Sequence, residues 1–322
     1  MQNSGFKTKI FSAITLGLIS QYSLAALPDT LKLDYAYYAP TSLVVKEQKL
    51  LEKALPNTQI KWVFSQGSNR SLEYLNSGSV DFSSTAGLAA VLSRANGSPI
   101  KTVYIQSQPE WTALLVAKNS PIKSLKDLKG KKIAATKGTD PFLFTLQALE
   151  TAGLNKKDVQ LVHLQHPDGK TALERGQVDA WAGLDPLMAA AQVQSGAKLL
   201  YRNVGFNSYS VLSTKEQFAN QSPEAIEAVI KAYEQARKWA KANPAKLAEL
   251  LARESKLPIA VAKLQLSRTN FEQNIPTAKH INALKKSGTI LTEEELVRNG
   301  TNVNQVVDQL FDAKYAQKVV KK

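Results

Sequence analysis

The chain has 322 residues and no cysteine, and its 41 basic and 27 acidic residues give a formal net charge of +14. The lack of cysteine excludes disulfides and thiol chemistry. The basic residues are scattered lysines rather than an arginine stripe interleaved with aromatic residues, so we expect no nucleic-acid partner. The positive charge instead favours small anions as ligands.

The first 25 residues predict a secretory signal peptide. Lys7 and Lys9 precede an apolar stretch over residues 10–19, and the small residues Ala25 and Ala26 follow. The apolar stretch is too short to span a bilayer, and there is no cysteine for lipid attachment. We therefore expect export to the periplasm, cleavage of residues 1–25, and no lipid anchor.

After this segment the sequence predicts strands and helices in alternation, which is typical of an α/β protein with parallel strands covered by helices. Strands are expected at 31–35, 60–64, 80–83, 111–117, 132–135, 159–164, 178–182, 199–201 and 210–213. Helices are expected at 42–55, 69–76, 86–95, 125–128, 141–152, 169–175, 187–194, 223–240 and 245–254. Near the end, Thr292 and Glu295 have the spacing of a capping box.

We expect two lobes joined by crossing strands, because no low-complexity linker separates the two series of strands. The first lobe is predicted to take residues 26–112 and 211–322, and the second to take residues 113–210. The strand at 210–213 is the expected return into the first lobe.

No pattern of residues indicates catalysis. The run Gly169, Lys170 and Thr171 has the end of a phosphate-binding loop, but Leu164 stands where the first glycine should be. His163 and His166 have the wrong spacing for a metal site on a strand and its loop. We therefore expect no enzyme activity, no cofactor and no metal.

Small polar residues follow three predicted strands at the points where helices begin. Helix starts expose unpaired backbone N–H groups and the positive end of the helix dipole, and both suit an anionic oxygen. Ligands of open α/β sheets bind at this edge, so a shared pocket is expected. Ordinary helix capping, by Asn69 or Asp140, is the alternative. The residues predicted for the pocket are Gln66, Gly67, Ser68, Ser84, Thr85, Gly138 and Thr139.

Aromatic residues are expected to complete this pocket, because a ring packs an apolar tail while its hydroxyl or indole N–H orients a polar head. We assign this role to Tyr37, Tyr38 and Trp181. Trp111 is expected at the first crossing between the lobes, and Trp62 in the core.

Three stretches carry a resemblance to a known family. They read Asn-Ser-Gly-Ser-Val-Asp-Phe-Ser-Ser-Thr at 76–85, Ser-Leu-Lys-Asp-Leu-Lys-Gly at 124–130 and Gly-Gln-Val-Asp-Ala-Trp at 176–181. Here the chain resembles the periplasmic aliphatic sulfonate- and taurine-binding proteins, within a wider group that includes nitrate and thiamine-precursor binders. The resemblance runs clearly from about residue 31 to residue 203, and more loosely through the helical tail.

The resemblance implies a type II periplasmic binding protein fold, with two lobes of mixed sheets flanked by helices and a central cleft. It further implies a monomer that binds a small anion, such as an aliphatic sulfonate or taurine, and delivers it to an ABC permease in the inner membrane. Ser84, Thr85, Gly138 and Thr139 match the anion-holding turns of the family.

Two departures from the family pattern concern the ligand. Asp185 and Pro186 match a Trp-Asp-Pro run near the cleft, but Leu184 replaces the tryptophan. Asp140 stands where sulfonate binders have a serine-rich turn, and a carboxylate facing the cleft would repel a sulfonate. Two alternatives remain open, namely an enzyme on the same fold in thiamine-pyrimidine-type metabolism and a ligand-sensing partner of a membrane receptor.

Overall fold

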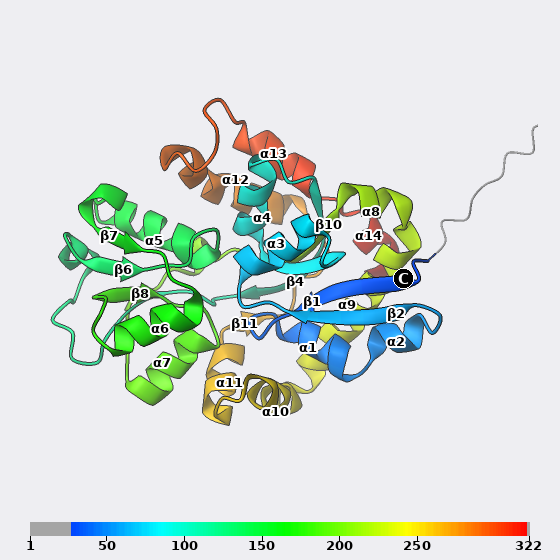
Figure 1. The fold of residues 1–322 in the computed structure, drawn as a ribbon, viewed down its shortest axis with the longest axis horizontal. Helices are drawn as coiled ribbons and strands as arrows, with labels where there is room; N and C mark the ends of the chain where they lie inside the picture. The colour runs from blue at the N-terminus through cyan, green and yellow to red at the C-terminus, as the bar shows by residue number, and fades with distance from the viewer. Residues whose placement is uncertain (1–26, 321–322) are drawn as a thin grey trace, which may run out of the picture.

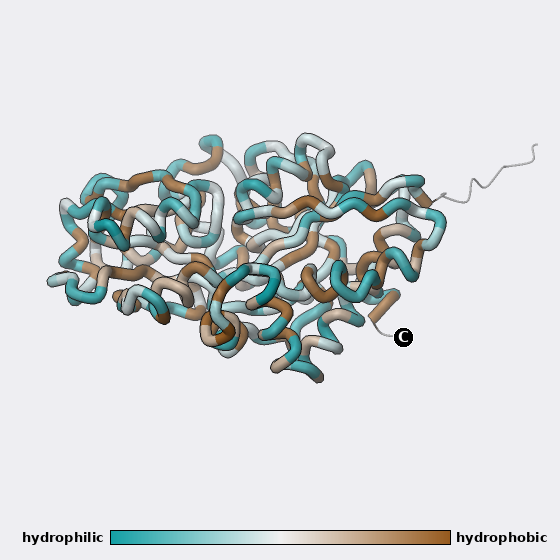
Figure 2. Tube along the Cα trace, turned by 60° about the horizontal axis from the view of Figure 1, so that its bottom comes forward, coloured by the Kyte–Doolittle hydropathy of each residue, from teal (hydrophilic) through white to brown (hydrophobic). Residues whose placement is uncertain are grey.

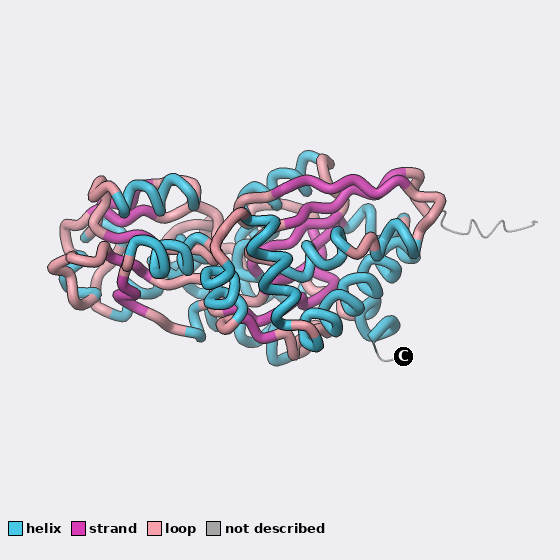
Figure 3. Tube along the Cα trace, turned by 90° about the horizontal axis from the view of Figure 1, so that it is seen from below, coloured by secondary structure: helices cyan, strands magenta, loops and turns pink. Residues whose placement is uncertain are grey.

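The structure is a computed structural model that describes residues 27–320, so the predicted signal peptide lies outside the described residues. The strands form two sheets that lie side by side along the longest axis of the molecule (Figure 1). Helices flank both sheets, as the view from below also shows (Figure 3). The predicted α/β class with two mixed sheets is therefore confirmed.

The first sheet has six strands in the order β11-β4-β10-β3-β1-β2. β2, β1 and β3 are parallel, whereas β10 runs antiparallel to both β3 and β4. The chain returns from the second sheet into the middle of the first through β10. Its strands are β1 (Thr30–Tyr35), β2 (Gln59–Phe64), β3 (Phe82–Ala86), β4 (Ile100–Pro109), β10 (Ser210–Lys215) and β11 (Thr269–Asn270).

The second sheet has five strands in the order β7-β6-β8-β5-β9. β7, β6 and β8 are parallel, and β5 runs antiparallel to its neighbours β8 and β9. Its strands are β5 (Leu114–Val116), β6 (Lys132–Ala134), β7 (Gln160–Val162), β8 (Ala180–Ala182) and β9 (Lys198–Tyr201). The chain crosses between the sheets twice, after β4 and after β9.

The helices that precede β10 are α1 (Pro40–Glu47), α2 (Leu50–Ala54), α3 (Ser68–Ser77), α4 (Gly87–Ala95), α5 (Asp140–Thr151), α6 (His166–Glu174) and α7 (Leu187–Ser195). The tail adds α8 (Glu216–Gln221), α9 (Pro223–Ala242), α10 (Pro244–Ser255), α11 (Ile259–Leu266), α12 (Ala278–Glu293), α13 (Val303–Leu310) and α14 (Lys314–Val320). Short 3-10 turns lie at Leu125–Leu128, Lys156–Asp158 and Val204–Phe206. No helix of the described residues is long and apolar enough to cross a membrane.

Apolar side chains at helical spacing bind the tail to the first sheet. Ile226, Val229, Ile230 and Tyr233 are buried on one side of α9, as their spacing predicts, and pack in a cluster with residues of β1 and α1. Figure 2 shows apolar and hydrophilic residues alternating along the helices. A second buried cluster continues from the first sheet into the second, so the two sheets share part of one core.

Two predicted elements differ from the structure, and one long strand was not predicted. The helix predicted over 42–55 is broken into α1 and α2, because Lys49 takes a left-handed conformation with φ of 51°. The strand β4 was not predicted, since it is buried on both faces and includes buried Thr102 and Gln106, so it lacks polar alternation. The predicted capping box is wrong, because Thr292 lies in the last turn of α12 rather than before a helix.

Candidate functional site

A cavity of about 230 Å³ lies where strand ends and helix starts of the two sheets meet. Its walls come from the segments after β1 and β2 in the first sheet, from the segments after β7 and β8 in the second, and from the C-terminal end of α10. This is the edge at which open α/β sheets bind ligands. The lining residues are Tyr37, Tyr38, Phe64, Ser65, Gln66, His166, Pro167, Leu184, Asp185, Pro186, Leu187, Ser255 and Leu257.

Aromatic rings form the wall on the side of the first sheet. The Tyr37 ring packs against Phe64 with 4.6 Å between ring centroids. Tyr38 is buried, and its hydroxyl donates to the Ser84 carbonyl oxygen at 2.9 Å and lies 3.2 Å from Ser65 Oγ. The predicted pair Tyr37 and Tyr38 therefore lies in the cavity wall, where the rings offer an apolar surface.

The buried carboxylate of Asp34 stabilises this wall through hydrogen bonds. Asp34, near the end of β1, accepts hydrogen bonds from Ser65 Oγ at 2.8 Å and from the Ser84 backbone N–H at 2.7 Å, and from the Ser71 hydroxyl of α3. Burial raises the pKa of Asp34 to about 6, although these donors oppose the shift. Asp34 thus fixes Ser65, and through it Tyr38, at the cavity.

The start of α6 forms the opposite wall. His166 is the first residue of α6, and burial lowers the pKa of its imidazole to about 3, so the ring is neutral. Its Nδ1 lies 3.1 Å from Thr136 Oγ1, while Nε2 has no hydrogen-bond partner among the described residues. A Cβ placed on Gly67, at the start of α3, would lie only 2.7 Å from His166 Nε2. The two sheets therefore touch here, and only a glycine fits without displacement.

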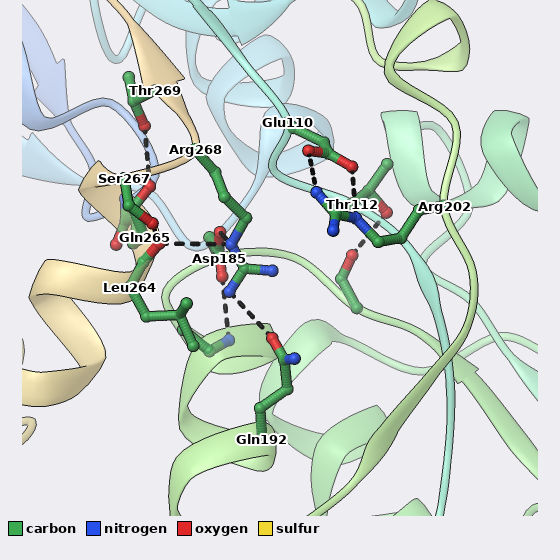
Figure 4. Close-up of polar contacts among 12 residues, drawn as sticks. Glu110, Thr112, Asp185, Gln192, Arg202, Leu264, Gln265, Ser267, Arg268 and Thr269 are labelled. Atoms are coloured by element: carbon green, nitrogen blue, oxygen red, sulfur yellow. Dashed lines mark hydrogen bonds and ion pairs between the residues drawn. The ribbon is translucent and has the colours of Figure 1, made fainter.

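Asp185 is the carboxylate of the cavity wall. It is buried in the turn after β8, and its Oδ1 accepts a hydrogen bond from the Ala189 N–H at 2.9 Å. Its Oδ2 lies 3.5 Å from Nε of Arg268, which comes from the segment between α11 and β11 (Figure 4). Burial raises the pKa of Asp185 to about 7, and the positive charge of Arg268 opposes that shift.

Asp140 does not face the cavity and is not the helix cap that the alternative interpretation expected. It is the first residue of α5, and its carboxylate accepts hydrogen bonds from Trp111 Nε1 at 3.0 Å and from the Ser208 N–H at 2.9 Å. Trp111 and Ser208 lie on the two segments that cross between the sheets, so Asp140 ties α5 to both crossings. The expected place of Trp111 at the first crossing agrees with this geometry.

The remaining predicted residues lie away from the cavity wall. Ser84 and Thr85 are buried within β3, paired with Leu212 and Val211 of β10. The Ser84 and Thr85 hydroxyls have no hydrogen-bond partner within residues 27–320. Ser68 Oγ accepts a hydrogen bond from the Ala86 N–H at 2.9 Å, which joins the start of α3 to the end of β3.

In the second sheet, the predicted residues also serve local structure. Gly138 has a φ of 77°, and the Thr139 hydroxyl donates to the Thr136 carbonyl at 2.6 Å, so these residues shape the start of α5. Trp181 is buried on β8 against α6, where a Cβ on Gly169 would lie 2.6 Å from its indole nitrogen. Trp181 is therefore a core residue of the second sheet and not part of the cavity wall.

Sequence reasoning missed a large part of the lining. His166 drew attention only as a metal ligand, yet the proline after it marks a helix start, which is the signal that could have placed it at the strand edge. Phe64 ends a predicted strand at the same edge, and Ser65 directly follows that strand. Ser255 and Leu257 come from the end of α10, and no local pattern indicates that this helix reaches the cavity.

Comparison with known proteins gives one family and one fold. The family model described as "NMT1/THI5 like" matches residues 58–247. A protein of Escherichia coli (strain K12), named as an aliphatic sulfonates-binding protein, is 30% identical over 296 residues, with 90% of this chain and 93% of that protein covered.

Two solved structures are similar to this chain over most of its length. The alkanesulfonate-binding protein SsuA from Xanthomonas axonopodis pv. citri, bound to MOPS, superposes with a TM-score of 0.81 at 26% identity, with 87% of this chain and 98% of that chain covered. The periplasmic aliphatic sulphonate binding protein SsuA from Escherichia coli gives a TM-score of 0.76 at 29% identity, with 89% and 94% covered. The chain has a periplasmic binding protein fold and belongs to the NMT1/THI5-like family.

Proposed function

We propose that this chain is the periplasmic solute-binding component of an ABC importer and that it binds a small aliphatic sulfonate in the cavity between its two sheets. The observation that carries the proposal is the cavity itself, which is lined by residues from the segments of both sheets and has a mainly apolar wall. A ligand held this way contacts both sheets at once, so its binding favours their approach.

The size and lining of the cavity support a short alkyl group. About 230 Å³ is below the roughly 300 to 1,000 Å³ of pockets that hold drug-sized ligands. Phe64, Leu184, Leu187 and Leu257 offer the alkyl group a surface from which water is excluded. We therefore favour an unsubstituted alkanesulfonate over taurine, whose ammonium group would be desolvated against this wall.

The starts of two helices support an anionic head group at the other end of the cavity. α3 begins beside Gly67 and α6 begins at His166, and both point their N-terminal ends at the place where the sheets touch. Unpaired N–H groups and the helix dipole stabilise an anion without a charged side chain. The exposed side chain of Gln66 supplies a further donor at this end.

The similarity of the chain to sulfonate-binding proteins supports the rest of the proposal. One such relative is named as a periplasmic protein, and we propose that this chain likewise acts in the periplasm, as a monomer and after cleavage of its predicted signal peptide. It passes the sulfonate to a membrane permease and leaves it chemically unchanged, as expected for a carrier rather than an enzyme.

Calorimetric titration and thermal unfolding test the proposal, in Tris buffer because a relative binds the sulfonate buffer MOPS. The ligands are propane-1-sulfonate, taurine, sulfate and nitrate. Propane-1-sulfonate at a hundredfold excess over its Kd should raise the free energy of unfolding by about 2.7 kcal/mol. The propane-1-sulfonate released from the protein should be chemically unchanged. No binding of any sulfonate, or turnover of the ligand, would contradict the proposal.

A matched pair of leucines tests the place of the ligand. Leu187 and Leu199 are both partly buried against the same apolar cluster, but only Leu187 lines the cavity. Leu187→Ala should weaken propane-1-sulfonate binding about tenfold, since about 1.5 kcal/mol of apolar contact is lost. Leu199→Ala should leave the Kd unchanged. Equal effects of the two substitutions would place the ligand elsewhere.

A further inference from the structure

Arg268 links the two sheets beside the cavity. Its backbone belongs to the first sheet, because its carbonyl oxygen accepts a hydrogen bond from the Glu110 N–H at 2.8 Å and the next residue begins β11. Its side chain reaches residues of the second sheet and its helices (Figure 4). The guanidinium Nη2 donates to Gln192 Oε1 of α7 at 2.9 Å, and Nε lies 3.5 Å from Asp185 Oδ2.

The surroundings hold this side chain in place. Arg268 is 8% exposed in its side chain and Asp185 is 1% exposed, so the ion pair is almost fully shielded from water. Nε also donates to the Leu264 carbonyl oxygen at 3.3 Å, which fixes the guanidinium against the end of α11. Arginine suits this role because its planar group binds several acceptors at once.

An apolar contact between α11 and α7 surrounds the pair. Val261 of α11 and Ala189 and Ala190 of α7 are fully buried in one cluster, with Leu257 and Leu264 packed against it. α11 directly precedes β11 of the first sheet, whereas α7 connects β8 and β9 of the second sheet. This contact therefore exists only while the two sheets are close. A hinge opening of a few ångströms would separate Arg268 from both of its partners in the second sheet.

We propose that Arg268 is a positioning residue that latches the two sheets together and neutralises Asp185, the carboxylate in the wall of the anion-binding cavity. Asp185 Oδ2 has no hydrogen-bond donor within the described residues, and Arg268 is the positive charge beside it. An anionic ligand next to an uncompensated Asp185 would be repelled, unless Asp185 took up a proton when the ligand binds. The latch therefore favours the closed arrangement and makes the cavity tolerate an anion.

Spin labels across the cavity test the latch without any ligand. The chain has no cysteine, so Arg70→Cys and Asp168→Cys provide two exposed labelling sites. Arg70 lies on α3, which follows β2 of the first sheet, and Asp168 lies on α6, which follows β7 of the second. In the ligand-free protein, Arg268→Met should move the label-to-label distances toward longer values than in the parent. Gln192→Ala, which leaves the ion pair in place, should cause a smaller shift in the same direction.

Ligand affinity gives the second readout, and only this one rests on the proposed function. Arg268→Met should weaken propane-1-sulfonate binding by about tenfold or more, as expected for loss of a charged hydrogen-bonding group. The same substitution should have a smaller effect in an Asp185→Asn background, because no charge is then left to neutralise.

Arg94→Met is the matched control. Arg94 is also a mostly buried arginine, 14% exposed in its side chain, and its Nη1 lies 2.8 Å from Glu216 Oε1. Both residues lie on helices that follow strands of the first sheet, so this ion pair does not link the two sheets. Its loss should lower stability but change neither distances nor affinity. The latch is wrong if Arg268→Met leaves the ligand-free distances unchanged, or if Arg94→Met shifts them equally. Failure of the parent to bind a sulfonate would refute the proposed ligand, while the distances still decide the latch.

Discussion

Replacing Gly67 by alanine should separate ligand affinity from stability. The added Cβ would lie 2.7 Å from His166 Nε2 and 2.9 Å from its Cδ2, whereas ordinary contacts begin at 3.4 Å. His166 cannot easily turn away, because it is buried and its Nδ1 lies against Thr136. The two sheets must therefore move apart in the variant whenever the ligand draws them together.

The size of the effect follows from the nature of this contact. Overpacking of this kind costs about 1 to 3 kcal/mol, which corresponds to a rise of about 5- to 150-fold in the Kd for propane-1-sulfonate. The backbone at Gly67 is extended, with φ of 179°, so alanine adds no backbone strain. The ligand-free protein can relieve the contact by opening, which loses the Arg268 contacts, while alanine lowers the entropy of the unfolded chain. These two effects oppose each other, so the free energy of unfolding should change by less than about 1 kcal/mol.

Calorimetric titration and urea unfolding measure the two quantities, and Gly97→Ala is the control. Gly97 has a φ of 100° and nothing within 4 Å of its added Cβ, so alanine brings backbone strain without a contact between the sheets. Gly97→Ala should lower stability by about 1 to 2 kcal/mol and leave the Kd unchanged. The reasoning is refuted if Gly67→Ala binds the ligand as tightly as the parent, or loses stability like Gly97→Ala.

Three further predictions concern stability. Asp140→Asn should flatten the pH dependence of the free energy of unfolding. Burial raises the pKa of Asp140 from 3.8 to about 6, so the stabilisation by its protonated form is complete below pH 4, and about 3 kcal/mol of it is lost as the pH rises through 6. Urea unfolding of the variant at several pH values should lack this loss. Thr85→Val should raise the free energy of unfolding by about 1 kcal/mol, because the buried hydroxyl has no hydrogen-bond partner among the described residues. The Kd for the sulfonate should stay unchanged. A higher Kd would show that Thr85 contacts the ligand, as the family resemblance implies. Leu284→Ala, on the buried side of α12, should cost about 2 to 5 kcal/mol in urea unfolding, and a loss below 1 kcal/mol would contradict the packing of that helix.

Much of the fold was predictable because the period of hydrophobic residues is a local property. The strands β1, β2 and β6 and the helices α3, α4, α5, α7 and α9 begin and end within a few residues of their predicted limits. In β1, β2, α3 and α9 more exposed and less exposed residues alternate with the period of the element, and the resulting pattern is visible in the sequence. β4 escaped prediction because both of its faces are buried, and the break at Lys49 escaped because a left-handed lysine leaves no signal in the sequence.

The candidate site was predictable only where it follows a strand. Tyr37, Tyr38, Gln66 and Asp185 line the cavity because they stand at strand ends, and the edge of a parallel sheet collects whatever follows its strands. Ser84 and Thr85 also stand near a strand end, but β3 extends through Ala86, so both lie inside the sheet.

The sequence by itself determined the α/β class, the two series of strands and the excess of positive charge, because composition and periodicity do not depend on distant contacts. Only the tertiary structure decided which groups face one another across the cavity. Three contacts join residues that lie 29 to 99 positions apart in the chain: Gly67 with His166, Arg268 with Asp185, and Asp140 with Trp111. No local pattern encodes such pairs, since they are fixed by the way the two sheets pack.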